Sequence, residues 1–122
     1  MSSLDILKDA RQMLDKPETW IQGAFSGYRE DDGNFVTGPD AEYEDCWCLT
    51  GALLSAIGKH HHGVNIHRDI IASVWQIIYN PGMLPENMTL VQWNDEPDRT
   101  HADVLLLLDH AIEHAQAAQN ID

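Results

Sequence analysis

The chain has 122 residues and carries 20 acidic residues against 7 Lys and Arg, which gives a formal net charge of -13 at neutral pH. This length suits one domain, residues 1–122, built around a single hydrophobic core. The charge excludes the lysine- and arginine-rich surface of ordinary nucleic-acid binders and disfavours anionic membranes, and no apolar run approaches the roughly 20 residues of a membrane span.

The first predicted element is an amphipathic helix that begins after Ser2 or Ser3, either of which can cap it. Its apolar residues between Leu4 and Leu14 recur at the three- and four-residue intervals of one helical face. The helix ends at Pro17, because proline cannot continue a helix. Residues 1–5 show no basic region and no apolar segment, so the sequence predicts no secretory signal.

A long acidic insert follows and runs to about Asp45. A strong turn signal at residues 31–34 lies between Tyr28 and Phe35, and this arrangement allows a short two-stranded β-ribbon. The insert holds seven acids: Glu30, Asp31, Asp32, Asp40, Glu42, Glu44 and Asp45. A solvated loop that aids solubility is the default for such a run. The functional alternative is a surface for a basic partner, or one that imitates nucleic acid.

The central predicted helix covers residues 44–58 and is apolar nearly all round. One face carries Leu49, Ala52, Leu53, Ala56 and Ile57, and the other carries Trp47, Gly51 and Leu54. Such a helix belongs in the middle of a domain. Cys46 and Cys48 would point about 200° apart on it, which rules out a disulfide between them and favours reduced thiols.

Two further helices complete the predicted fold. One runs from about Ile66 to Tyr79 and is stopped by residues 80–82, which include Pro81. The other is capped by Asp98 or Thr100, with Asp103 in the position of a capping-box acid. Residues 88–93 are too short a pattern to assign. The prediction is an all-α fold: a compact four-helix domain with a long acidic loop, which allows the short β-ribbon, between helices 1 and 2.

Several short motifs occur in a fixed order along the chain. They are Trp20-Ile21-Gln22-Gly23-Ala24-Phe25, a turn at Asp32-Gly33, Trp47-Cys48-Leu49-x-Gly51-Ala52-Leu53, Trp93-Asn94-Asp95, and Thr100-x-x-Asp103-Val104-Leu105. This series resembles a family of small uncharacterised proteins of phages and bacteria, a domain of unknown function. The resemblance covers about residues 4–115 and implies a compact protein with no established activity, cofactor or catalytic residues. The run His60-His61-His62 departs from the family's pattern.

One candidate site is a cysteine nucleophile at Cys48, with His101 as base and Asn94 or Asp95 as orienting group. A nucleophilic cysteine needs a thiolate, and so a neighbouring base and some exposure. The apolar surroundings of Cys48 instead raise the pKa of a thiol and make it unreactive. A buried structural cysteine is therefore the favoured interpretation, and no catalytic residue is assigned.

A second candidate is a metal site. The residues that could ligate zinc are His60, His61, His62 and His67, with Cys46 and Cys48 nearby in the sequence. Their spacing does not match the ligand pairs of zinc modules. His110 and His114 lie one helical turn apart, but two ligands alone do not make a site. We predict no metal and no cofactor.

The third candidate is the turn Trp93-Asn94-Asp95. A turn followed by a helix cap explains these residues fully, and a ligand site is the alternative. Overall, the sequence favours a non-enzymatic, cytoplasmic, protein-binding accessory protein, in the bacterial host cell if phage-encoded. Its binding residues would be the turn and the insert acids Glu30, Asp31, Asp32, Asp40, Glu42 and Glu44, facing a basic protein. The alternative is a small cysteine- or metal-dependent hydrolase that uses Cys48, His101 and Asp95.

Overall fold

The computed structural model describes residues 3–24, 26–29, 35–37, 45–60, 64–79, 82, 84–85 and 87–119. The helices of this part of the chain are α1 (Ser3–Met13), the 3-10 turn η1 (Pro17–Thr19), α2 (Leu49–His60), α3 (Val64–Tyr79), α4 (Leu90–Asn94) and α5 (His101–Gln119). The strands are β1 (Ser26–Arg29), β2 (Phe35–Thr37) and β3 (Cys46–Trp47). The protein is therefore mostly helical, with a small antiparallel sheet in the order β2-β1-β3.

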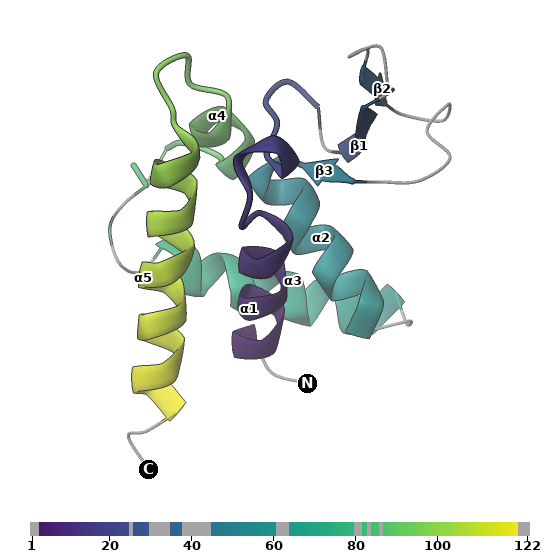
Figure 1. Ribbon diagram of the computed structural model, residues 1–122. Helices are drawn as coiled ribbons and strands as arrows, with labels where there is room; N and C mark the ends of the chain where they lie inside the picture. The colour runs from purple at the N-terminus through teal and green to yellow at the C-terminus, as the bar shows by residue number, and fades with distance from the viewer. Residues whose placement is uncertain are drawn as a thin grey trace.

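The long helices pack around α1, which lies between α2 and α5 (Figure 1). Helix α3 crosses behind α1 and contacts α1, α2 and α5. Helix α4 packs against α2, and the sheet lies beside the start of α2, away from the end at which the chain begins (Figure 1). Within the part of the chain that the model describes, no helix is both long and apolar enough to cross a membrane.

The core is made of the apolar stripes that helical spacing predicts. Its fully buried large side chains are Ile6, Leu7, Leu14, Leu49, Leu53, Ile57, Val74, Ile78, Leu90, Val104, Leu107 and Leu108. Burial of such side chains is the main favourable term in folding, at about 1.5–3 kcal/mol for each. The predicted core faces of the first and central helices are confirmed, and α3 and α5 add Val74, Ile78, Val104, Leu107 and Leu108 to the same core.

The central helix starts later than predicted. Residues 46–47 form strand β3, and the helix begins at Leu49. The physical reason is long-range pairing: the backbone N–H of Asp45 donates to Gly27 O (2.8 Å) and that of Ile21 donates to Trp47 O (3.0 Å). These partners hold the residues before Leu49 in extended conformation, so the premise that both cysteines lie on one helix was wrong. Cys46 and Cys48 nevertheless form no disulfide.

The central helix is also less completely buried than predicted. Leu54 is 41% exposed, whereas its neighbour Leu53 is fully buried. Gly51, on the predicted second face, is buried. Helix α2 therefore packs on the core through the face that carries Leu53 and also buries Gly51, whereas Leu54 is exposed to solvent.

The predicted β-ribbon is confirmed, because β1 and β2 pair antiparallel with Tyr28 opposite Val36. Strand β3, which pairs with the other edge of β1, was missed. Helix α4 was missed as well, because residues 88–93 were too short a pattern to assign. Its capping box is complete: Thr89 Oγ1 accepts from the N–H of Gln92 (3.1 Å), and the Gln92 side chain accepts from the N–H of Thr89 (3.0 Å). A plain four-helix domain is thus only a coarse description.

Of the two predicted caps of the last helix, Asp98 and Thr100, the structure confirms Thr100. Its hydroxyl accepts from the N–H of Asp103 (3.1 Å), while the Asp103 carboxylate accepts from the N–H of Thr100 (3.1 Å). Of the acidic insert, only Asp45 lies within the described residues, and it is exposed. The six other acids of the insert lie outside them.

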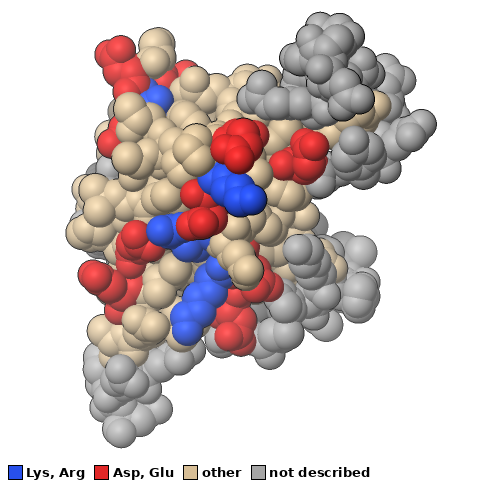
Figure 2. Space-filling model, in the orientation of Figure 1, with Lys and Arg blue, Asp and Glu red and all other residues tan. Residues whose placement is uncertain are grey.

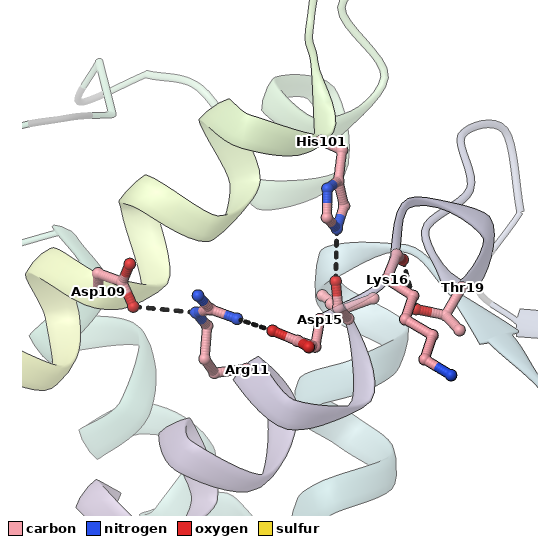
Figure 3. A network of polar contacts seen from close by, with 7 residues as sticks. Arg11, Asp15, Lys16, Thr19, His101 and Asp109 are labelled. Atoms are coloured by element: carbon pink, nitrogen blue, oxygen red, sulfur yellow. Dashed lines mark hydrogen bonds and ion pairs between the residues drawn. The ribbon is translucent and has the colours of Figure 1, made fainter.

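The positive charges on the face seen in Figure 2 are interleaved with acids along α1 and α5. Arg11 on α1 donates to Asp15 (2.8 Å) and to Asp109 on α5 (2.9 Å), as Figure 3 shows. The pair with Asp109 joins α1 to α5, and exposed ion pairs of this kind contribute about 0–1 kcal/mol each. Arg11 therefore forms its ion pairs with acids of its own chain.

Candidate functional site

Three segments meet at the side chain of Asn94, the last residue of α4. The indole Nε1–H of Trp20 donates to Asn94 Oδ1 (2.7 Å), and so does the backbone N–H of Leu49 (3.0 Å). The Asn94 amide in turn donates to Ile21 O (3.1 Å). Asn94 has no solvent exposure, and its oxygen satisfies one of the N–H groups left open at the start of α2. It therefore acts as a helix cap supplied from a distant part of the chain.

The neighbouring residue, Asp95, extends this junction to the surface. Its Oδ1 accepts from the Asn94 side-chain amide (3.0 Å) and from the backbone N–H of Gly23 (3.0 Å). Gly23 has a φ of +83°, in the left-handed region where glycine is favoured. Gln22 also contacts this turn, donating to Asn94 O and Glu96 O at 2.8 Å each. The carboxylate is thus held in place while Asp95 itself stays exposed.

A small open pocket lies at this junction. It is lined by Gly23, Ala24, Cys48, Val91 and Asp95 and has a volume of about 130 Å³. Cys48 forms the buried part of its wall, and Val91 is 36% exposed. The pocket therefore combines an aliphatic wall, a thiol and a carboxylate that come from three separate segments.

The Cys48 thiol is held in its neutral form. Burial raises its pKa, the N–H groups of Gly51 and Thr50 act in the opposite direction, and the nearby carboxylate of Asp95 raises the pKa further. The thiol also accepts from the N–H of Gly51, at 3.2 Å. The sequence prediction of a buried, unreactive Cys48 agrees with this environment.

His101 does not join Cys48 at the pocket. Its Nε2 lies 2.6 Å from the carbonyl oxygen of Leu14, to which it donates (Figure 3). Its ring packs at a tilt against Trp20, with the ring centroids 6.4 Å apart. The structure therefore brings together Cys48 and Asp95 from the proposed catalytic set, and it places His101 in a contact between α5 and the end of α1.

The third member of the predicted turn, Trp93, belongs to the core at 4% exposure. Arg99 covers its ring, with the guanidinium carbon 3.8 Å from the ring centroid, and donates to Trp93 O at 2.8 Å. Within Trp93-Asn94-Asp95, only Asp95 reaches the surface. Sequence reasoning named these residues for binding but missed Gly23, Ala24 and Val91, although Gly23 and Ala24 lie within the first motif of the family resemblance.

The candidate metal ligands do not form a cluster in the described part of the chain, where no group of three or more His, Cys, Asp or Glu side chains is placed to hold an ion. His60 ends α2 and His67 lies within α3, but their side chains, like His61 and His62, fall outside what the structure describes. His110 and His114 are both exposed on α5. The prediction that the protein uses no metal stays a prediction.

Thiol chemistry gives a direct check on Cys48. We expect neither cysteine to react with a disulfide reagent at neutral pH in the folded protein, because Cys46 is fully buried and Cys48 is 2% exposed. Burial raises the pKa of the Cys48 thiol in the folded state, so folding favours the protonated thiol. This contribution to the free energy of unfolding is fully present below the ordinary thiol pKa and is lost as the pH rises through the raised pKa. Fast labelling of one thiol in native buffer would contradict this prediction and favour a nucleophile.

No curated protein and no solved structure matches this chain. A family model does match it, and the match covers residues 1–114. All the segments that meet at Asn94, and the pocket beside it, lie within these residues. The chain belongs to the family of unknown function DUF6197.

Proposed function

We propose that this protein is a non-enzymatic accessory protein that binds a basic protein partner. The observation that carries the proposal is the excess of acids: 20 acidic residues face 7 Lys and Arg, a net charge of -13. Two of the arginines are already engaged with acids of the chain, Arg11 with Asp15 and Asp109 and Arg99 with Asp103. The acids still outnumber all the Lys and Arg of the chain by 20 to 7, and complementary charge accelerates and orients association with a basic surface.

The surface around Asp95 supports this proposal. Among the described residues, no Lys or Arg forms an ion pair with Asp95, and an exposed valine borders the same pocket. The carboxylate can accept a hydrogen bond from a cationic group of a partner, and Val91 can contact the apolar part of the same group. The phage or bacterial source implied by the sequence resemblance is part of the proposal. We do not propose the cysteine hydrolase, because that mechanism needs His101 beside Cys48 and His101 instead contacts the carbonyl oxygen of Leu14.

The proposal is tested by a pull-down from the native cell, eluted with a salt gradient. Two variants neutralise the insert, one at Glu30, Asp31 and Asp32 and one at Asp40, Glu42 and Glu44, each changed to the corresponding amide. We expect the protein to stay folded and the partner to elute at lower salt or to be lost, because screening and loss of charge weaken the same attraction.

A matched control removes the same number of charges elsewhere. Glu18→Gln, Asp98→Asn and Glu113→Gln change three exposed acids that lie away from the insert in the sequence. We expect this control to retain the partner more strongly than either insert variant. If every variant releases the partner at the same salt concentration as the unaltered protein, the acids serve solubility alone and the proposed function is wrong.

A further inference from the structure

We propose that the pocket beside Asn94 receives the side chain of a lysine from the basic partner, with the ammonium group bound by Asp95. This inference rests on the proposed function and adds to it the site and the residue type that are recognised. The pocket's lining residues are Gly23, Ala24, Cys48, Val91 and Asp95.

The size of the pocket suits one side chain. Its volume is about 130 Å³, somewhat less than the roughly 150 Å³ of a cavity that holds a single benzene molecule. A lysine side chain has five non-hydrogen atoms in an unbranched row, so it fits a space of this order. The pocket is open to solvent, so a side chain can enter from a partner's surface.

The walls match the two parts of a lysine. Ala24, Val91 and the Cys48 sulfur offer apolar or weakly polar contact, which suits the four methylene groups of the stem. Because burial raises the pKa of the Cys48 thiol and keeps it neutral, Asp95 is the charged group among the described residues of the lining. A cation gains from this site, whereas a neutral alkyl group of the same length gains only the contacts of the stem.

The hydrogen bonds of Asp95 select lysine over arginine. Oδ1 already accepts from the N–H of Gly23 and from the side-chain amide of Asn94, whereas Oδ2 accepts from no group of the described residues. A guanidinium group binds a carboxylate best through both oxygens, whereas an ammonium group needs only one. The junction around Asn94 therefore leaves a single, fixed acceptor that suits a point charge.

The backbone at Gly23 keeps the entrance open. An added Cβ at Gly23 would find no heavy atom within 4 Å, so the space beside this residue is unfilled. The positive φ of Gly23 points its N–H at Asp95, which means that the same residue holds the carboxylate and leaves room beside it. The site is therefore in place before any ligand binds, which lowers the cost of binding.

The test is a titration of the ¹⁵N-labelled full chain, followed by NMR, with three capped pentapeptides. Each has glycine at four positions and lysine, arginine or Nε-acetyl-lysine at the centre. We expect the lysine peptide to shift the amide signals of Gly23, Ala24 and Asp95, the arginine peptide to bind several-fold more weakly, and the acetyl-lysine peptide to cause no saturable shift.

Two variants of the pocket and one control make the result specific. Asp95→Asn keeps the acceptor for Gly23 but removes the charge, and we expect about tenfold weaker binding of the lysine peptide. Ala24→Leu fills the pocket without changing the charge and should abolish binding. Asp98→Asn removes an equal charge from an exposed residue outside the pocket and should bind like the unaltered protein.

The outcomes separate this inference from the proposed function. If the three peptides bind alike, or if Asp98→Asn weakens binding as much as Asp95→Asn does, the pocket does not recognise lysine. If the salt-sensitive partner of the pull-down is lost with the insert variants but kept by Asp95→Asn and Ala24→Leu, the pocket inference is wrong and the proposed function stands. If Asp95→Asn and Ala24→Leu lose the partner while Asp98→Asn keeps it, the result supports both the pocket inference and the proposed function.

Discussion

Replacing Asn94 with alanine is expected to lower the free energy of unfolding by about 3–5 kcal/mol, which is a large effect for one polar side chain. The side chain is fully buried and bonds to three groups in two other segments: the indole of Trp20, the carbonyl of Ile21 and the backbone N–H of Leu49. Alanine would leave these groups without this partner, and the bonds to Leu49 and Ile21 are buried. Each buried group that loses its partner costs about 1–3 kcal/mol.

The measurement is urea denaturation followed by circular dichroism, with Gln92→Ala as the control. Gln92 lies in the same short helix, but its side chain is exposed and bonds only to the N–H of Thr89. Loss of this half of a capping box should cost about 0.5–1 kcal/mol. If the two variants lose equal stability, Asn94 is not the junction that holds α2, α4 and the segment from Trp20 to Gly23 together.

The Asn94 junction also explains which parts of the structure the sequence could predict. Helical spacing is a local signal, so the core faces of α1, α2 and α5 follow from the positions of leucine, isoleucine and alanine alone. The pairing of β1 with β2 has a local signal too, since residues 31–34 have the sequence of a turn and the structure pairs Tyr28 with Val36. These elements are the ones that were predicted correctly.

The start of α2 and the pocket depend instead on contacts between distant residues. Residues 46–47 look helical in sequence because apolar residues continue through them, yet their partners are Gly27 and Ile21, about twenty or more positions away. Tertiary pairing overrides a local preference in such a case. Asn94 reads as an ordinary turn residue, and nothing local shows that its amide caps a helix that begins at Leu49.

The same limit applies to the choice among candidate sites. Cys48, Asp95 and His101 each had the right chemistry for a hydrolase, and their spacing in sequence could not show which would meet. The structure joins Cys48 and Asp95 through the pocket and turns His101 towards Leu14. A pair consisting of a neutral thiol and a carboxylate lacks the base that a cysteine nucleophile needs, but it suits the wall of a cation-binding pocket.

Two neighbouring leucines of α2 give the sharpest test of how this helix packs. Leu53 is fully buried and Leu54 is 41% exposed, although they are adjacent and chemically identical. We expect Leu53→Ala to lower the free energy of unfolding by about 2–5 kcal/mol, because it removes buried methyl groups and leaves a cavity. Leu54→Ala should cost less, about 0.5–1 kcal/mol, since only part of the Leu54 side chain is buried and alanine favours the helix.

Both variants are compared by urea denaturation at several protein concentrations. If Leu54→Ala costs as much as Leu53→Ala, the second face of α2 is buried as its sequence suggests, and the cover must come from another molecule or from residues beyond those described. A cost that grows with protein concentration would identify a second copy of the chain as that cover, because self-association stabilises the folded state by mass action. A small cost at every concentration leaves Leu54 on a free surface of α2.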